Sequence, residues 1–286
     1  MVWFSDEAVE RWRAGTRTTP GGQRTYSDLA SLTASMLRAV YRLALRQTEG
    51  LVASLAQVLG LDLAVPDHST LSRRAKTVSV PTLPAKATEP VRLLVDSTGV
   101  KLCGPGDWLI EKHSTHQRRA WRKLHVGIDA ATRRIVAATL TEYDVDDTSQ
   151  VGPLLDQIAE PLNVVIADGA YDQSGVYEVV QKRQPGAGVV VPPRSTAVPS
   201  DTAHSAPTPR DRHLQTIVAG GRMAWQATSG YNVRTLVEAF FSRYKRVIGD
   251  GLQFQTDDRQ QTEIGVAVLV LNRMLDLGRS DSVRIA

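Results

Sequence analysis

The chain has 286 residues, enough for one large domain or for one large and one small domain. Its net charge of +4, from 34 basic and 30 acidic residues, does not indicate an anionic partner unless the positive charge is clustered. A single cysteine, Cys103, excludes an internal disulfide and a four-thiolate zinc site, and the lack of an apolar run of about 18 residues predicts a soluble, cytoplasmic protein with no membrane partner.

The N-terminal part is predicted to be helical. Apolar residues recur at helical spacing over Ser27–Gly60, which ends on a glycine suited to a C-cap. After a loop, Asp67 is placed to N-cap a short helix over 68–76, which carries Arg73 and Arg74. This arrangement resembles a helix-turn-helix DNA-reading head, although its loop is longer than usual. A plain helical bundle with a basic surface is the alternative.

A β-rich pattern follows. The runs Val91–Val95, Lys123–Asp129 and Arg134–Leu140 predict a three-stranded antiparallel meander. Farther along, the strand-like runs Val164–Ala167 and Gly188–Val191 alternate with helical patterns. Those helical patterns lie at about 148–158 and 174–183. Alternation of this kind predicts an α/β sheet that is covered by helices on both faces.

The C-terminal third begins with an irregular segment. Residues 194–228 are rich in Pro, Ser, Thr and Arg, and predict an insertion or extended loop with a small hairpin around Gly220 and Gly221. The stretch Tyr231–Gly249 then predicts a helix, and the apolar pattern over 259–277 predicts a buried closing helix.

The predicted helix Tyr231–Gly249 has an unusual polar face. At about 100° per residue, Tyr231, Arg234, Glu238 and Lys245 share one narrow arc. The opposite, apolar side is predicted to be buried and consists of Val233, Leu236, Phe240, Tyr244 and Val247. The arc places a carboxylate, a guanidinium, an ammonium and a phenol where a substrate can reach them. Alternatively, it is a solvated face on which Arg234 and Glu238 form an ordinary i,i+4 pair.

Two more acids occur in a matching context. Asp96 and Asp168 each directly follow a run of buried-type strand residues, and strand ends of α/β sheets are where ligands bind. Together with Glu238 they form three candidate carboxylates, which stay ionised at low cost only if a cation lies between them. Oxygen-only ligation suits Mg²⁺ or Mn²⁺, and two such ions catalyse in-line phosphoryl transfer.

Several motifs carry a family resemblance. The pattern Tyr-x2-Arg-x3-Glu-x6-Lys at Tyr231, Arg234, Glu238 and Lys245 is the most specific of them. The others are Leu94–Gly99, Ala167–Asp172, Arg46–Gly50, Pro66–Arg74 and Trp121–His125. On these motifs the chain resembles bacterial insertion-sequence transposases with an Asp-Asp-Glu catalytic triad, in the group of insertion sequences four and five and in its insertion sequence five-like family. The resemblance implies a ribonuclease-H-like fold.

The resemblance also implies roles. Asp96, Asp168 and Glu238 would be the metal-binding catalytic triad, with Mg²⁺ or Mn²⁺ as cofactor. The residues that would hold DNA near the cut are Tyr231, Arg234 and Lys245. Further expected DNA contacts are Arg73, Arg74, Arg122 and Lys123, the last two from a basic segment over Lys112–Arg134. Family members act as dimers or larger assemblies on paired terminal inverted repeats, in the bacterial nucleoid.

The implied domain plan has four parts. They are a helical, helix-turn-helix-like DNA-binding region at 1–80, a linker at 81–90, a ribonuclease-H-like catalytic domain at 91–250 with an insertion at about 194–228, and a C-terminal helix at 251–286 that is expected to pack on the catalytic domain. Relatives usually carry further residues before the Val2–Asp6 segment, so this chain is expected to start late.

The function predicted on this basis is that of a DNA transposase, which binds its terminal repeats, cuts by hydrolysis and joins the freed 3′-hydroxyl to target DNA. Two alternatives stay open: a truncated, catalytically inactive derivative that acts as a DNA-binding protein, and a ribonuclease-H-like nuclease without strand transfer.

Other acids compete with the three candidates. Asp144, Asp146 and Asp147 form the densest acidic cluster, but they precede a helix start, where acids act as caps and favour the helix dipole. Asp172 is interpreted as a turn or cap residue rather than a fourth ligand.

Histidines and a tryptophan were also considered. His113, His116 and His125 lack the i,i+4 spacing of a helical zinc site, and are assigned a phosphate-contacting or surface role. Trp225 is assigned to packing of the hairpin on the catalytic domain, with stacking on an unpaired base as the alternative.

Overall fold

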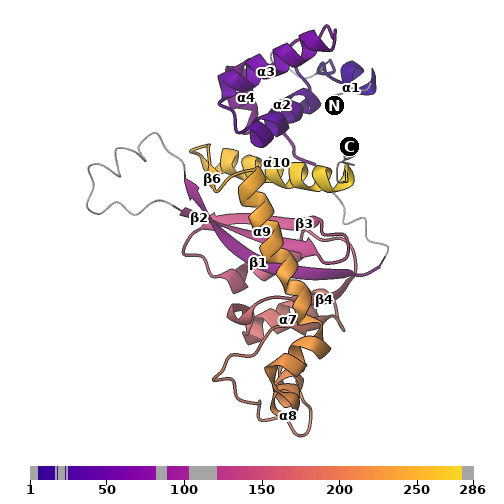
Figure 1. The fold of residues 1–286 in the computed structure, drawn as a ribbon, viewed down its shortest axis with the longest axis vertical. Helices are drawn as coiled ribbons and strands as arrows, with labels where there is room; N and C mark the ends of the chain where they lie inside the picture. Colours follow the sequence, from indigo (N-terminus) through magenta and orange to yellow (C-terminus); the bar gives the residue numbers. More distant parts are fainter. Residues whose placement is uncertain are drawn as a thin grey trace, which may run out of the picture. The chain divides into compact units, whose positions relative to one another are not determined.

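The computed structural model describes residues 6–16, 18, 23, 25–81, 89–102 and 121–278. The chain divides into two compact units (Figure 1). The first unit comprises residues 1–82, 102–117 and 246–286, and the second unit comprises 83–101 and 118–245. Several residues named above lie outside this description. They are Cys103, His113, His116, the basic residues of the segment Lys112–Arg134 that precede Trp121, and most of the predicted linker.

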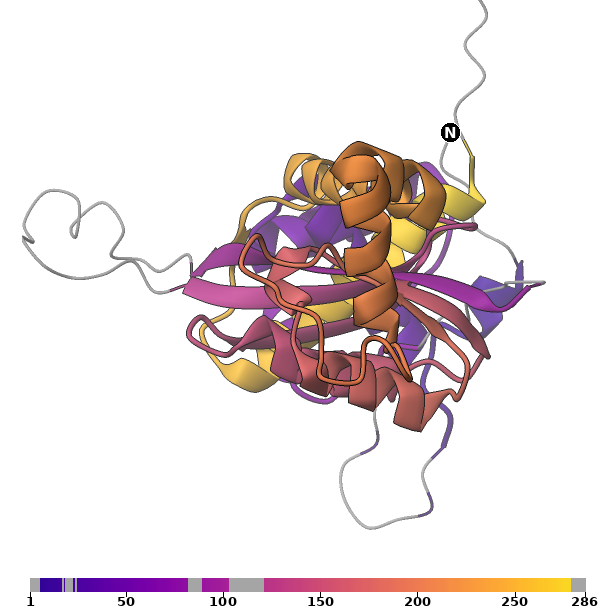
Figure 2. The same cartoon turned by 90° about the horizontal axis from the view of Figure 1, so that it is seen from below.

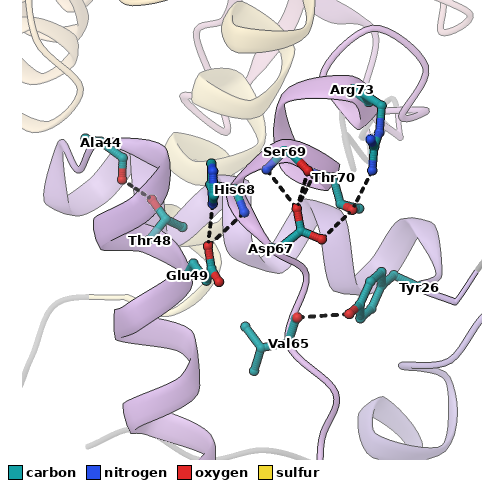
Figure 3. Close-up of polar contacts among 10 residues, drawn as sticks. All are labelled: Tyr26, Ala44, Thr48, Glu49, Val65, Asp67, His68, Ser69, Thr70 and Arg73. Carbon is teal, nitrogen blue, oxygen red and sulfur yellow. Dashed lines mark hydrogen bonds and ion pairs between the residues drawn. The ribbon is translucent and has the colours of Figure 1, made fainter.

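The first unit is helical where it is described. Its elements are α1 (Asp6–Glu10), α2 (Asp28–Tyr41), α3 (Leu45–Val58), α4 (His68–Arg74), the two-residue strand β6 (Gly251–Leu252) and α10 (Asp257–Asp276). The long helical pattern predicted over Ser27–Gly60 is two helices, because Arg42 adopts a left-handed φ of 53° that ends α2. The predicted short helix and its cap are confirmed, since Asp67 accepts from the backbone N–H groups of Ser69 and Thr70 at 2.9 and 2.8 Å (Figure 3).

Polar contacts fix α4 within this unit. His68 donates its backbone N–H to Glu49 of α3 at 2.9 Å, and its Nδ1 lies 2.9 Å from the same carboxylate oxygen (Figure 3). The loop before α4 is held by the Tyr26 hydroxyl, which donates to the carbonyl of Val65 at 3.0 Å. Beneath these contacts lies a small apolar core of Trp12, Ala30, Ala34, Val52 and Leu71. The short helix is therefore presented from a packed scaffold.

The second unit is built on a mixed sheet. Its strands are β1 (Val91–Leu102), β2 (Trp121–Asp129), β3 (Ile135–Glu142), β4 (Leu162–Ile166) and β5 (Gly188–Val190). Its helices are η1 (Asp147–Gln150), α6 (Val151–Leu155), η2 (Gly169–Tyr171), α7 (Ser174–Arg183), α8 (Pro209–Ser229), η3 (Tyr231–Arg234) and α9 (Thr235–Val247). The strand order is β3-β2-β1-β4-β5, with β3, β2 and β1 antiparallel and β4 and β5 parallel to β1. The predicted meander is confirmed.

Helices cover both faces of this sheet. On one face α6 and α7 bury a core that includes Leu93, Val95, Leu154 and Val180. On the other face lies α9, and Figure 2 shows α7 and α9 on opposite sides of the strands. The predicted two-sided α/β layering is therefore confirmed.

Three local expectations were wrong. Asp96 does not end its strand, because antiparallel pairing with β2 keeps the backbone extended as far as Lys101. The segment before α9 is not a hairpin: the capping box of Thr208 and Asp211, with Pro209 at the first turn, starts the helix α8. Within α8, Gly221 leaves helical geometry at φ 81° and ψ 169°, so a kink stands where a turn was predicted.

Candidate active site

Sheet register places Asp96 beside Asp168. Leu94 of β1 pairs in parallel with Ile166 of β4, and each acid follows its paired residue by two positions. Because alternate residues of a strand point to the same face, equal offsets carry both carboxylates to one side of the sheet. β4 ends at Ile166, so Asp168 lies just beyond the last paired residue, at the N-terminus of η2.

Arg234 joins the three candidate carboxylates. Its Nη2 lies 2.9 Å from Asp96 Oδ2 and 3.5 Å from Asp168 Oδ2, and its Nη1 lies 2.9 Å from Glu238 Oε1. Residues far apart in the sequence thus converge on one guanidinium. Arg234 closes the 3₁₀ turn η3 and Glu238 follows one turn later in α9, so both project from the same face.

The carboxylates form a series from buried to exposed. The side chains of Asp96, Asp168 and Glu238 are 15%, 35% and 65% exposed. Burial raises the pKa of Asp96, and the charges of Asp168 and Asp147 raise it further, against the backbone N–H of Ser97 and the guanidinium of Arg234. The exposed end of the series, at Glu238, is where a large substrate has access.

The donor set suits a divalent ion. Across the described residues, no three acidic, histidine or cysteine side chains lie close enough, as they are placed, to share one ion. Three carboxylates nevertheless converge on one cationic group, the guanidinium of Arg234, and oxygen ligands of this kind fit Mg²⁺ or Mn²⁺. Asp96, Asp168 and Glu238 would hold such ions after the Arg234 side chain moves out from between them.

The other two members of the predicted polar arc lie differently. The Tyr231 ring packs against Trp225 with ring centroids 5.3 Å apart, and burial raises the pKa of its phenol. Lys245 is exposed on α9, seven residues beyond Glu238 and therefore roughly 10 Å along the helix axis. On the apolar side of the helix, Phe240 and Tyr244 are buried as predicted. The predicted helix Tyr231–Gly249 begins with the 3₁₀ turn η3 in place of an α-helical turn, so the residues of α9 are rotated about the helix axis and Val237 is buried as well.

The predicted DNA contacts divide by accessibility. Arg73 is exposed on α4, where it donates to Thr70 Oγ1 at 3.1 Å. Arg74 is instead ion-paired with Asp28. Arg122 is buried and paired with Glu142, and Lys123 donates to the carbonyl of Val145 at 2.8 Å. Arg73 and Lys245 are exposed residues, whereas Arg74, Arg122 and Lys123 are less exposed and form ion pairs within the fold.

One sequence interpretation, that of His125, is wrong, and that of Asp172 is incomplete. His125 does not have a surface role, because its ring is fully buried and its Nε2 lies 2.9 Å from Thr141 Oγ1; burial lowers its pKa to about 4. Asp172 is the C-cap of η2, as predicted, and its backbone N–H donates to the carbonyl of Gly169. Its buried carboxylate also receives two hydrogen bonds from Arg210, at 2.7 and 3.0 Å, which the sequence did not indicate. Arg210 belongs to α8, in a segment that was predicted to be an extended loop.

Two neighbouring acids of the cluster, Asp146 and Asp147, make different contacts. Asp146 caps η1 as predicted, since it accepts from the Thr148 N–H at 3.2 Å. Asp147, by contrast, lies 3.4 Å from both Lys123 Nζ and His125 Nδ1, and its charge raises the pKa of Asp96. No local sequence pattern distinguishes these two neighbouring acids.

The strand order and directions of the second unit define a ribonuclease-H-like mixed sheet flanked by helices. Residues 87–273 match a family model described as "Transposase DDE domain", and residues 1–105 match a second model of the same description. The chain belongs to the transposase DDE domain family, a class of transposase enzymes.

Three solved transposase structures match the chain at low sequence identity and at TM-scores below 0.5. The piggyBac transposase in its synaptic complex with hairpin DNA is 11% identical at a TM-score of 0.48, over 94% of this chain and 72% of that chain. The Drosophila P element transposase strand transfer complex is 10% identical at 0.36, over 92% and 67%. The Mos1 mariner paired-end complex with Mn is 12% identical at 0.23, over 93% and 83%.

No helix among the described residues is both long enough and apolar enough to cross a membrane.

Proposed function

We propose that this chain is a bacterial insertion-sequence transposase of the insertion sequence four and five group, which binds the terminal inverted repeats of its own element and catalyses phosphodiester hydrolysis followed by strand transfer. The observation that carries this proposal is the convergence of Asp96, Asp168 and Glu238 on Arg234. Both reactions are in-line attacks at a phosphodiester, so one set of carboxylates can serve both.

In this proposal each group has a distinct task. Asp96, Asp168 and Glu238 would hold Mg²⁺ or Mn²⁺, which would supply activation of the attacking water or 3′-hydroxyl and stabilisation of the leaving oxygen. Arg234 holds the scissile phosphate, because a guanidinium donates two parallel hydrogen bonds to phosphate oxygens. Tyr231 and Lys245 contact the backbone on either side. The exposed position of Glu238 leaves that carboxylate open toward the DNA.

The first unit is proposed to bind the terminal repeat. In α4 and the turn that follows it, the exposed residues Ser69, Arg73 and Lys76 recur at helical spacing, so they share one face. The contacts of His68 and Asp67 orient that face (Figure 3). Such a polar, basic face is suited to a DNA groove. Paired terminal repeats require at least two copies of the chain, so the working complex is proposed to be a homodimer or larger, located in the bacterial nucleoid.

The test uses the full chain, a labelled duplex of the element's own terminal repeat, and Mg²⁺. We expect end-specific cleavage and, with target DNA, joined products. Glu238→Gln should abolish both, whereas Glu178→Gln, the same change at an exposed site of the second unit, should abolish neither. Full activity of Glu238→Gln would refute the triad. Binding without cleavage would identify a DNA-binding derivative, and cleavage without joined products would identify a nuclease.

A further inference from the structure

The helix α8 is anchored at its start and folds back on itself at Gly221. Arg210 holds the start by its two bonds to the buried carboxylate of Asp172. Gly221 leaves helical geometry, and a hydrogen bond joins the two halves of α8: Trp225 Nε1–H donates to His213 Nδ1 at 3.0 Å. In a straight α-helix these two residues would be about 18 Å apart along the axis. The hydrogen bond therefore holds α8 closed at its kink.

The two partners of His213 fix the state of its imidazole. An indole N–H only donates, and a backbone carbonyl only accepts. His213 Nδ1 faces the indole of Trp225, and Nε2 lies 2.8 Å from the carbonyl oxygen of Val189 in β5. The ring must therefore carry its proton on Nε2 and be neutral, because an imidazolium offers no acceptor to the indole.

These two bonds tie α8 to the strand beside the one that leads to Asp168. Val189 pairs with Val165 of β4, and Asp168 follows Val165 by three residues. On the other side of the imidazole, Trp225 is 1% exposed, and its ring stands nearly perpendicular to that of His213 with the centroids 5.6 Å apart. One half-buried side chain thus links the sheet to the second half of α8.

The second half of α8 leads directly to the candidate active site. Trp225 packs on the ring of Tyr231 with the centroids 5.3 Å apart. A single residue, Gly230, at a left-handed φ of 74°, separates α8 from η3, the 3₁₀ turn that ends at Arg234. Arg234 Nη2 in turn lies 3.5 Å from Asp168 Oδ2. A shift of Trp225 would therefore displace the guanidinium that the three carboxylates share.

We propose that His213 is a positioning residue of the candidate active site: its neutral imidazole holds Trp225, and through Trp225 it sets the position of Tyr231 and Arg234 relative to Asp168. This role rests on the proposed function, since it takes Arg234 as the group that holds the scissile phosphate. His213 itself touches neither DNA nor metal. Because a displacement of about 1 Å can slow a reaction by roughly 10²-fold, loss of the imidazole should slow cleavage and leave DNA affinity nearly unchanged.

Two substitutions separate the two hydrogen bonds of His213. His213→Asn keeps an acceptor at the position of Nδ1, and His213→Gln keeps a donor at the position of Nε2. With the full chain, a labelled terminal-repeat duplex and Mg²⁺, His213→Gln should cut at least about tenfold more slowly at saturating duplex and bind the duplex within about twofold of wild type. His213→Asn should cut within about threefold of wild type, because it can still accept from Trp225.

Trp225→Phe removes the indole donor and keeps an aromatic ring. It should slow cleavage as much as His213→Gln does, and the double variant should be no slower than either single variant, because both changes break the same bond. If His213→Gln fails to fold, Trp225→Phe makes the same test. Gln215→Ala is the matched control, since it removes a hydrogen bond from the same helix to the carbonyl of Ala203, and it should leave cleavage within about twofold of wild type.

A measurement without DNA separates this role from the proposed function. In ¹H–¹⁵N spectra of the full chain, His213 should show a protonated Nε2 and a bare Nδ1. The Arg234 Nε–H signal, assigned through Arg234→Gln, should shift in His213→Gln and stay in place in His213→Asn and Gln215→Ala.

An unmoved Arg234 signal together with normal cleavage in His213→Gln would overturn the positioning role. Equal slowing by His213→Asn or Gln215→Ala would overturn it too, because any disturbance of α8 would then have the same effect. If the Arg234 signal shifts as expected but the wild-type chain cuts no terminal repeat, the proposed function fails, whereas the control of Arg234 by His213 is upheld.

Discussion

Replacement of Arg234 by glutamine tests whether its guanidinium occupies the position of a metal ion. The side chain supplies the positive charge among three carboxylates, at 2.9, 3.5 and 2.9 Å. A direct pair at about 3 Å has a Coulomb energy of roughly 5 kcal/mol at an effective dielectric constant of about 20. Desolvation cancels much of that energy, and the exposed pair with Glu238 contributes under about 1 kcal/mol. The net loss of stability should be about 2 kcal/mol, mainly from Asp96.

Two measurements on the DNA-free chain check this estimate. Thermal unfolding without metal should begin roughly 4–8 °C lower in Arg234→Gln, given about 2–4 °C per kcal/mol for a unit of this size. Calorimetric titration with Mn²⁺ should show at least about tenfold tighter binding, because a competing cation has been removed and about 1.4 kcal/mol corresponds to a factor of ten. DNA cleavage should nevertheless fall, because the phosphate loses its bidentate donor.

Arg243→Gln provides the control, since it removes the same charge farther along α9. It should leave Mn²⁺ affinity within about twofold of wild type, because half-buried Arg243 lies nine residues beyond Arg234, roughly 13 Å along the helix axis, and the effect of a charge at that distance is weak. If Arg234→Gln bound Mn²⁺ no more tightly than wild type, the guanidinium would not compete with metal, and the assignment of the three carboxylates to one cation site would fail.

Three further outcomes follow from the structure. The pKa of Asp96 is raised, and Asp96 binds metal only in its ionised form. Mn²⁺ affinity should therefore be full above that pKa and fall as the pH drops through it, at a higher pH than for an ordinary aspartate. Calorimetric titrations at about pH 4–7 measure this fall in affinity. Asp172→Asn should destabilise the second unit by about 2–3 kcal/mol in urea unfolding, because Arg210 loses a buried partner, and an unchanged midpoint would contradict the anchoring role. Arg73→Ala should weaken terminal-repeat binding and reduce the slope of log affinity against log salt concentration by about one, without changing stability; filter binding measures this. Arg74→Ala should chiefly lower the free energy of unfolding, by about 1–2 kcal/mol, because Arg74 is paired with Asp28; thermal unfolding measures this.

The sheet was largely predictable from the sequence because its signals are local. Runs of β-branched residues defined β1, β2 and β4, and the helical pattern after Ser174 matched the bounds of α7. The Asp67 cap was equally readable, because a short side-chain acceptor before a helix satisfies its first N–H groups. In each case a few neighbouring residues determine the outcome.

Other features depend on partners that a local pattern does not contain. The extension of β1 beyond Asp96 comes from its antiparallel neighbour, and the buried state of His125 comes from the layers on its side of the sheet. The helix α8 had readable start signals at Thr208 and Pro209, but the adjacent Gly220 and Gly221 favoured a turn. The contrast between Asp146 and Asp147 follows from tertiary packing alone.

The candidate site also resolves an ambiguity in the helix that carries Glu238. From sequence, an ordinary surface ion pair with Arg234 and a functional carboxylate were alternatives, because the same i,i+4 spacing serves both. The pair does form, at 2.9 Å, and the same guanidinium also meets Asp96 and Asp168. An ordinary surface ion pair does not account for two further carboxylates beside the same guanidinium. Three acids that converge remain ionised together only if a cation lies among them. The Arg234–Glu238 ion pair is therefore one of three interactions between this guanidinium and the carboxylates. Without a cation the three carboxylates would repel one another, so the ion pair supports the site.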